Sequence, residues 1–431
     1  MAQQPLISIT RLHLAENDLL DFQYLRALAY QLYGGAAPGD VLQAAHEIAR
    51  RGGKRTDFIE VWAGHGRRAA RMAAEALEQG RRATARAGYL RAYNYLRMAE
   101  FFFDRHNQQE HRALYFESLA CFDQAARLFD VPAEPIEIPS ERGVTMPGYF
   151  FKPAPDDRPR ATVIISGGGD GFGEEIFFVG GVPEALARGL NVLLFHGPGQ
   201  RGLLHRHPGL VFRADAEVPL GAVIDYARSR ADVDPERLAL YGLSFGGYLA
   251  LRAAAHDQRI KALVANPPIP NFYALLVSIV TETLPARIRP ITARLLAHAP
   301  AQLWNILAGR LRAGDWVWDA MIDNYMLWNN GVATFAEFVE KTKQYTIDGC
   351  EAAIRCPTLC LVAEGESPAA MAQARRFYEA VQGPKRFEVL SVADGADSHC
   401  GVSNIAYTSA IVYDWLLEAF TGSTSGGRNR G

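Results

Sequence analysis

The 431-residue sequence predicts an α/β protein, in which a doubly wound, mostly parallel sheet follows a helical N-terminal domain and carries a helical insertion. The first observation is that short apolar runs such as "TVIISGGG", "NVLLFHGPG" and "KALVANPP" alternate with helical stretches after residue 160. The second is that these runs are apolar throughout, as expected of strands covered on both faces. In such a sheet, ligands bind at the carboxyl ends of the strands.

The N-terminal part is predicted to be helical. Segments such as "HGRRAARMAAEALEQG" and "ARAGYLRAYNYLRMAEFFFDRH" place apolar residues three or four positions apart, the period of an amphipathic helix. A proline-rich stretch with short alternating strands follows at 131–160 and marks a domain boundary. We therefore predict a helical domain at 1–134 and a sheet domain at 135–268 and 350–420.

A long interval separates the runs "KALVANPP" and "PTLCLVAEGE". Residues 269–349 are helix-like and hold four of the six tryptophans. The interval is too long for a plain crossover, so we predict a helical cap inserted over the sheet. The last residues, 421–431, are rich in Gly and Ser and are predicted to be a flexible tail.

Composition excludes several classes of protein. With 49% hydrophobic and 21% charged residues and a net charge of −2, the chain is expected to be globular and to bind no nucleic acid. Residues 50–97 are locally basic, which we interpret as a solvated helix face, with a surface for an anionic partner as the alternative. No leader-like or membrane-spanning run is seen, so we expect a cytoplasmic protein with no membrane partner. The five cysteines indicate neither a disulfide framework nor a zinc site.

The stretch "YGLSFGGY" (241–248) places Ser244 between glycines, directly after the strand "RLALY" and before a helix-like segment. A strand, a sharp turn and a helix are the context in which a serine hydroxyl is presented as a nucleophile. The alternative is that Ser244 is only a small residue in a tight turn. We favour the nucleophile.

A serine hydroxyl needs a base, and in this kind of sheet the order along the chain is Ser, acid, His. His399 follows the last predicted strand, whereas His298 falls in the insertion, so His399 is predicted to be the base. The acid is predicted to be Glu366, with Glu364 as the alternative, because both follow the strand "PTLCLVA". Asp394 and Asp397 are expected to shape the turn before the histidine.

Backbone N–H groups are predicted to stabilise the oxyanion that a serine attack creates. Phe245 N–H lies at the start of the helix after Ser244, and "ISGGGDGFGEE" (165–175) supplies Gly168, with Gly169 next, after an earlier strand. The alternative for this second motif is a glycine-rich turn without a catalytic role.

The motif "GPGQRG" (197–202) matches a dinucleotide-binding pattern, but a true one opens a helix at once. The sequence continues as "LLHRHPG", for which we predict no helix, and we therefore predict no cofactor. His196, His205 and His207 are not accompanied by ligands at a familiar metal spacing, so no metal site is predicted.

Five stretches together resemble a known group: "YLRAYNYLRMAEFFF", "GGGDGFGEE", "HGPGQRG", "GLSFGG" and "GADSHC". In this order and spacing the chain resembles the α/β-hydrolases similar to 2,6-dihydroxypseudooxynicotine hydrolase and to the fungal polyketide-shortening hydrolases of pigment pathways. The resemblance implies the α/β-hydrolase fold, an N-terminal domain that helps to close the active site, and a homodimer. Two features depart from the group's pattern: the acid is Glu366 rather than Asp, and D-G-P-G-Q-G carries His196 and Arg201.

The resemblance implies hydrolysis of a carbon–carbon bond next to a ketone, or of a related ester, in an aromatic or polyketide-like small molecule. The alternatives are an esterase, lactonase, thioesterase or acyl-transferring cyclase of secondary metabolism, and an inactive binding module with the same fold. Aromatic residues of the cap suit a flat apolar ligand, and His196 lies near the expected substrate side. The residues predicted to contact substrate are Trp304, Trp316, Trp318, Tyr325, Trp328 and His196.

Overall fold

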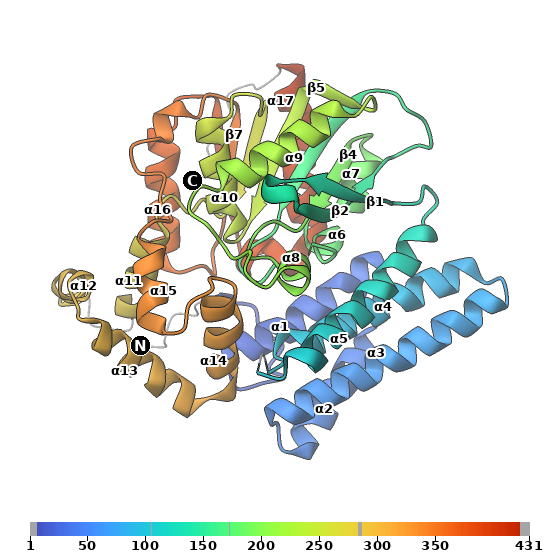
Figure 1. Cartoon of the computed structure of the whole chain (residues 1–431), viewed down its shortest axis with the longest axis horizontal. Coiled ribbons are helices and arrows are strands. Elements are labelled where there is room, and N and C mark those ends of the chain that lie inside the picture. The colour runs from blue at the N-terminus through green and yellow to red at the C-terminus, as the bar shows by residue number, and fades with distance from the viewer. Residues whose placement is uncertain (1–6, 105, 172, 283–286, 423–431) are drawn as a thin grey trace.

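The computed structural model describes residues 7–104, 106–171, 173–282 and 287–422. At its centre is an eight-stranded sheet with the order β1-β2-β4-β3-β5-β6-β7-β8 (Figure 1). The strands are β1 Glu134–Pro139, β2 Thr145–Phe151, β3 Arg160–Ser166, β4 Asn191–Phe195, β5 Val233–Leu243, β6 Ala262–Asn266, β7 Thr358–Ala363 and β8 Lys385–Leu390. β1 and β2 pair antiparallel at one edge and the other six strands are parallel. The predicted mostly parallel sheet is therefore confirmed.

Both faces of the sheet are buried. In β3, Val163 and Ile165 belong to the core on one face and Ile164 to the core on the other, because side chains alternate along a strand. Residues of α7 and α17 join the first core, and residues of α9, α10 and α16 join the second. The helices of this part are α6 Ile176–Val179, α7 Val182–Ala187, α8 Arg201–Arg206, α9 Glu217–Ser229, α10 Gly246–His256, α16 Pro368–Ala380 and α17 Ile405–Thr421, with 3₁₀ turns η2 Glu141–Gly143, η4 Glu351–Ala353 and η5 His399–Asn404. Burial on both sides explains why the strands are apolar throughout.

The N-terminal region is helical, as predicted. It contains α1 Asp18–Ala29, η1 Tyr30–Tyr33, α2 Pro38–Arg51, α3 Arg55–Glu78, α4 Arg82–Phe101 and α5 Gln108–Arg127. Glycines let α3 and α4 approach closely: a Cβ at Gly66 would lie 2.6 Å from Leu96 Cγ, and one at Gly88 would lie 2.8 Å from Ala73 Cβ. In the described part of the chain, none of the helices combines the length and the apolar character needed to cross a bilayer.

Between β6 and β7 the chain forms a second group of helices, here called the insertion helices. They are α11 Phe272–Glu282, α12 Arg289–Ala297, α13 Ala301–Gly314, α14 Trp316–Met321, the π-helix η3 Ile322–Trp328 and α15 Phe335–Thr342. In Figure 1 they lie beside the N-terminal helices at the same end of the sheet. The Tyr325 hydroxyl donates a hydrogen bond to the Phe101 carbonyl at 2.5 Å, and Asn324 Nδ2 donates to the Phe103 carbonyl at 2.9 Å. The two helical regions therefore meet over the sheet.

Candidate active site

Ser244 lies at the turn between β5 and α10. Its φ of +58° is in the left-handed region, which a residue other than glycine adopts only where the surrounding structure holds it there. The neighbouring glycines make the turn possible, since a Cβ at Gly242 would lie 2.1 Å from the Gly246 carbonyl oxygen. A Cβ at Gly246 would lie 2.3 Å from the Ser166 carbonyl oxygen. The sequence "GLSFGG" thus folds into a strained strand-to-helix turn that presents the serine to a cavity.

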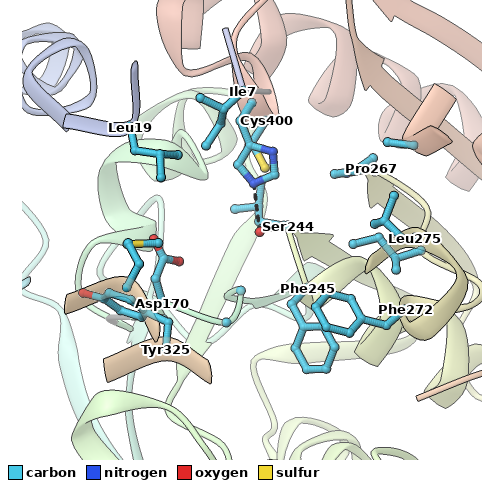
Figure 2. Close-up of a pocket in the computed structure, with 18 of the residues that line it drawn as sticks. Ile7, Leu19, Asp170, Ser244, Phe245, Pro267, Phe272, Leu275, Tyr325 and Cys400 are labelled. Atoms are coloured by element: carbon cyan, nitrogen blue, oxygen red, sulfur yellow. Dashed lines mark hydrogen bonds between the residues drawn. The ribbon is translucent and has the colours of Figure 1, made fainter. Parts of the chain in front are cut away.

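Three side chains that are distant in the sequence meet at this turn. Ser244 Oγ lies 2.8 Å from His399 Nε2, and His399 Nδ1 lies 2.6 Å from Glu366 Oε1. Figure 2 shows the first of these hydrogen bonds as a dashed line. Each residue follows a different strand, β5, β7 or β8, so the parallel order of the strands brings all three to one edge of the sheet. The arrangement allows Nε2 to accept the serine proton while Nδ1–H donates to the carboxylate.

The two glutamates that follow β7 have different partners. Glu366 is bonded to the imidazole, whereas Glu364 Oε2 accepts a hydrogen bond from the Val392 N–H at 2.8 Å. Asp394 accepts a hydrogen bond from the Ser391 hydroxyl at 2.5 Å. Of the carboxylates considered from the sequence, the geometry selects Glu366 as the partner of the histidine.

Hydrogen bonds to residues near the N-terminus hold the loop that carries His399 in place. The His399 N–H donates to the Ile7 carbonyl at 2.8 Å. The Asp397 carboxylate accepts hydrogen bonds from the Ile9 N–H at 2.8 Å and the Thr10 N–H at 2.7 Å. Residues more than 380 positions apart therefore hold the imidazole in place. The sequence pattern contains no signal for this contact.

The protonation of His399 is set by opposing influences. Burial lowers the pKa of the imidazole, while the neighbouring Cys400 and the hydrogen-bonded Glu366 carboxylate raise it by more, so that the pKa lies well above its ordinary value. A histidine acting as a base must be neutral. Activity is therefore expected to appear at higher pH than an unperturbed histidine would allow.

We expect the Glu366→Gln variant to shift this pH profile. Removing the negative charge lowers the pKa of His399, so the rising limb of kcat/KM moves to lower pH, and the maximum falls because the imidazole is less well oriented. The measurement is kcat/KM for a p-nitrophenyl ester across pH, with Glu364→Gln as the matched control. A limb that stays in place in E366Q, or that moves equally in E364Q, would contradict this assignment.

Two backbone segments lie next to Ser244. Phe245 is the N-cap of α10, at the end of the helix where N–H groups have no partner within the helix. Gly168 approaches Ser244 from the loop after β3, and a Cβ built on it would lie 2.6 Å from Ser244 Cβ and 3.0 Å from Ser244 Oγ. A side chain at this position would occupy the space beside the hydroxyl. We expect the N–H groups of Phe245 and Gly168 to donate to an oxyanion formed at Ser244.

A cavity of about 340 Å³ opens above Ser244, and N-terminal, sheet and insertion elements all line it. On one side of Ser244 its wall is apolar and includes Phe245, Phe272 and Leu275. Leu276, Ile279 and Phe338 are further apolar residues of the lining. On the other side lie Asp170 and Tyr325, and Figure 2 shows Ser244 between the two sides. Arg26 and Glu175 also belong to the lining. The site is therefore an apolar cavity with a few charged groups.

Four of the aromatic residues predicted to contact substrate do not line this cavity. These are Trp304, Trp316, Trp318 and Trp328. Trp304 is buried in the core of the insertion helices, and Trp316 Nε1 donates to the Gly53 carbonyl at 3.0 Å, so both indoles serve packing between helices. Tyr325 does line the cavity. The period of a helix shows that it has an apolar face, but the sequence does not show which neighbour covers that face.

His196 is also absent from the described lining, which corrects the prediction that it contacts substrate. Its side chain is buried; Nε2 lies 2.8 Å from Glu174 Oε1, and Nδ1 accepts from the Gly202 N–H at 3.0 Å. Because Nδ1 accepts from the backbone, the ring carries its proton on Nε2 and donates it to the carboxylate. His196 thus supports the loop structure beneath the site.

The "GPGQRG" segment has a structural role, and one expectation about it was wrong. A helix does follow: α8 begins at Arg201 and spans six residues. Within the motif, Gln200 Nε2 donates to the Gly167 carbonyl at 2.9 Å, and Gln200 Oε1 accepts from the Gly197 N–H at 2.8 Å. The motif therefore holds the glycine-rich loop that contains Gly168.

A buried cluster that sequence reasoning missed lies behind this loop. Glu100 Oε1 is 2.6 Å from His111 Nε2 and 3.2 Å from His205 Nε2, and these three residues are close enough together to hold a metal ion. Arg201 Nε lies 3.5 Å from the same carboxylate oxygen, and its guanidinium stacks on the ring of Tyr325 at 4.7 Å. Burial lowers the pKa of His205 to about 4, which keeps it neutral. The arginine already supplies the positive charge that the carboxylate requires, so the cluster is balanced without a metal.

The chain is similar to known hydrolases in sequence and in structure. The Alpha/beta hydrolase family model matches residues 162–402, which include Ser244, Glu366 and His399. The hydrolase ORFZ of Pyricularia oryzae is 37% identical over 285 residues, which is 63% of this chain and 66% of that protein. The 20-hydroxy-prefusarin hydrolase of Gibberella moniliformis is 32% identical over 355 residues, covering 80% of this chain and 81% of the relative.

A solved structure shares the fold over almost the whole chain. The 2,6-dihydroxy-pseudo-oxynicotine hydrolase superposes with a TM-score of 0.68 and covers 92% of this chain and 96% of its own, at 19% sequence identity. The match includes the N-terminal helices as well as the sheet, in agreement with the predicted fold. Together with the family match and the relatives above, it leads to one conclusion: the chain belongs to the α/β-hydrolase family of enzymes.

Proposed function

We propose that the protein is a serine hydrolase that cleaves a carbon–carbon bond next to a ketone, or a related ester, in an aromatic or polyketide-like small molecule. The observation that carries the proposal is the hydrogen-bonded series Ser244–His399–Glu366 beneath a largely apolar cavity. An alcohol, a base and an orienting acid are the groups that acyl transfer requires.

In the first half of the reaction, Ser244 Oγ attacks the carbonyl carbon and its proton passes to His399 Nε2. The negative charge that forms on the carbonyl oxygen is stabilised by the N–H groups of Phe245 and Gly168. Glu366 stabilises the imidazolium through Nδ1. The products of this step are a tetrahedral oxyanion bonded to Ser244 and a protonated His399.

The oxyanion then collapses and expels the leaving group. In a β-diketone, the carbon–carbon bond breaks and its electron pair enters the enolate of the second ketone, which is protonated by His399. The acyl group remains on Ser244 Oγ. A water molecule then gives a proton to His399, its oxygen attacks the acyl carbon, and Ser244 leaves with the proton that His399 returns. The net reaction adds one water and yields a carboxylic acid and a ketone.

The cavity favours a small, mostly apolar substrate. Its volume of about 340 Å³ is in the range of small-molecule sites, and aromatic side chains such as Phe245 and Phe272 line one side. The relative from Gibberella moniliformis is named as a hydrolase of 20-hydroxy-prefusarin, which supports a small-molecule substrate. The resemblance described from the sequence points to the bond next to a ketone.

The experiment compares 1-phenyl-1,3-butanedione with a series of p-nitrophenyl esters of increasing chain length. We expect hydrolysis of the diketone to benzoate or acetate and the matching ketone, together with slower ester hydrolysis, both abolished in Ser244→Ala. Ester hydrolysis without cleavage of the diketone would assign the protein as an esterase. Failure of both reactions with wild-type protein would contradict the proposed class of substrate.

A further inference from the structure

The side of the cavity opposite Phe245 and Phe272 contains a carboxylate, Asp170. It lies in the loop after β3, two residues beyond Gly168, and Figure 2 shows it beside Tyr325, on the side of Ser244 away from Phe245 and Phe272. None of the chemistry described so far uses this side chain.

Arg26 from α1 forms ion pairs with both Asp170 and Glu175, which differ in their exposure. Nη1 lies 2.5 Å from Asp170 Oδ2, and Nη2 lies 2.5 Å from Glu175 Oε2. Glu175 is almost fully buried, with a side chain only 2% exposed, and it also accepts a hydrogen bond from the Tyr30 hydroxyl at 2.5 Å. The Asp170 side chain is 26% exposed. One guanidinium therefore bridges an interior carboxylate and a carboxylate that faces the cavity.

Asp170 is ionised in this setting. Burial raises the pKa of its carboxyl group, but the charge of Arg26, its hydrogen bond and the charge of His399 lower it by more. An ionised carboxylate only accepts hydrogen bonds, and its two oxygens offer about four acceptor positions. The contact with Arg26 goes through Oδ2. The carboxylate also accepts a hydrogen bond from its own backbone, but its side chain is 26% exposed and lines the cavity, so acceptor positions remain for a ligand.

The ion pairs that hold Asp170 and Glu175 contain equal numbers of positive and negative groups. Arg97 Nη1 lies 3.2 Å from Glu175 Oε1, so two arginines face two carboxylates in this part of the structure. A cationic ligand would add an unpaired positive charge to a buried site, which is costly. A neutral hydrogen-bond donor adds no charge and satisfies the exposed acceptor positions.

We infer that the Asp170 carboxylate is a binding subsite for a neutral hydrogen-bond donor of the substrate, a hydroxyl or an amide N–H, on the side of the attacked carbonyl opposite the apolar wall. This inference rests on the proposed function, because it takes Ser244 as the point of attack. It assigns a polarity to the substrate: an apolar part lies toward Phe245 and Phe272, and a donor group lies toward Asp170. Arg26 acts as a positioning residue that fixes the carboxylate.

The experiment measures how fast Ser244 is labelled by matched fluorophosphonates. One set carries a secondary amide at different positions along an alkyl chain, and the second set carries the N-methyl amide, which lacks the donor. For at least one position we expect the N–H compound to label wild-type protein on the order of 10- to 100-fold faster, as for a hydrogen bond to a charged acceptor. We expect this ratio to fall in Asp170→Asn and to be lost in Asp170→Ala.

Glu175→Gln is the matched control, because Glu175 is the other carboxylate held by Arg26 but its side chain is only 2% exposed, against 26% for Asp170. The preference for the N–H compounds is expected to survive in E175Q even if the absolute rate changes, whereas a merely structural role of the Arg26 ion pairs would affect both variants alike. No preference at any position in wild-type protein, or a preference that persists in D170A, would overturn the inference. Failure of a plain alkyl fluorophosphonate to label Ser244 would instead overturn the proposed function on which it rests.

Discussion

Replacing Ser244 with alanine is expected to lower kcat/KM by roughly 10³- to 10⁶-fold, the range seen when a triad nucleophile is removed. The variant lacks only Oγ, the atom that lies 2.8 Å from His399 Nε2. Alanine has the same Cβ as serine, so the strained turn with φ of +58° gains no new steric conflict. The measurement is hydrolysis of a p-nitrophenyl ester, with the melting temperature as the control for folding.

The residual activity of S244A also distinguishes attack by the Ser244 hydroxyl from attack by a water molecule that His399 activates. If Ser244 forms the covalent intermediate, the residual rate reflects only binding and the oxyanion donors. If His399 activated a water directly, the alanine variant would keep a large share of the wild-type rate. A rate within tenfold of wild type, in a variant that folds normally, would contradict the nucleophilic role of Ser244.

The second large effect is expected for Gly168→Ala. A Cβ at this position would lie 2.6 Å from Ser244 Cβ and 3.0 Å from Oγ, so either the loop or the serine must move. Displacing one oxyanion donor typically costs about 10²- to 10³-fold in kcat, and we expect a loss of this size. The measurement is kcat and KM for the same ester.

Gly169→Ala is a close control for this effect. A Cβ at Gly169 would meet its nearest neighbour, Phe245 Cβ, at 3.7 Å, an ordinary van der Waals contact. We expect G169A to keep kcat within about tenfold of wild type, because nothing forces its backbone N–H to move. An equal loss of kcat in G168A and G169A would show that the loop tolerates no side chain at either position. It would then contradict a specific role of the Gly168 N–H as an oxyanion donor.

The parts of the site that the sequence could predict are those set by chain order and local geometry. Ser244 is recognisable because a serine between glycines, after a strand and before a helix, has few structural explanations. His399 and Glu366 follow from their positions after later strands, since parallel strands bring their carboxyl ends to one edge. The sequence left Glu364 open as the acid because both glutamates follow β7. Only the direction of each side chain, one to the imidazole and one to the Val392 N–H, separates them.

The parts that could not be predicted depend on contacts between distant elements. Arg26 lies in α1, and the sequence does not show that this helix packs beside Asp170. Trp304 and Trp316 were expected at the cavity because they are aromatic, yet they fill spaces between helices. His196 was expected near substrate, and it instead pairs with Glu174 below the surface of the cavity. In each case the sequence shows the type of the residue, but tertiary packing decides which neighbours its side chain contacts.

The central claim is that His399 and Glu366 make the hydroxyl of Ser244 reactive. The most direct measurement is the rate and position of labelling by an alkyl fluorophosphonate, followed by peptide mass spectrometry, in wild type, His399→Ala and Glu366→Ala. The account predicts one label per chain on Ser244 in the wild type, labelling slower by orders of magnitude in H399A and a smaller decrease in E366A. A label on another residue, or H399A labelled as fast as wild type, would contradict it.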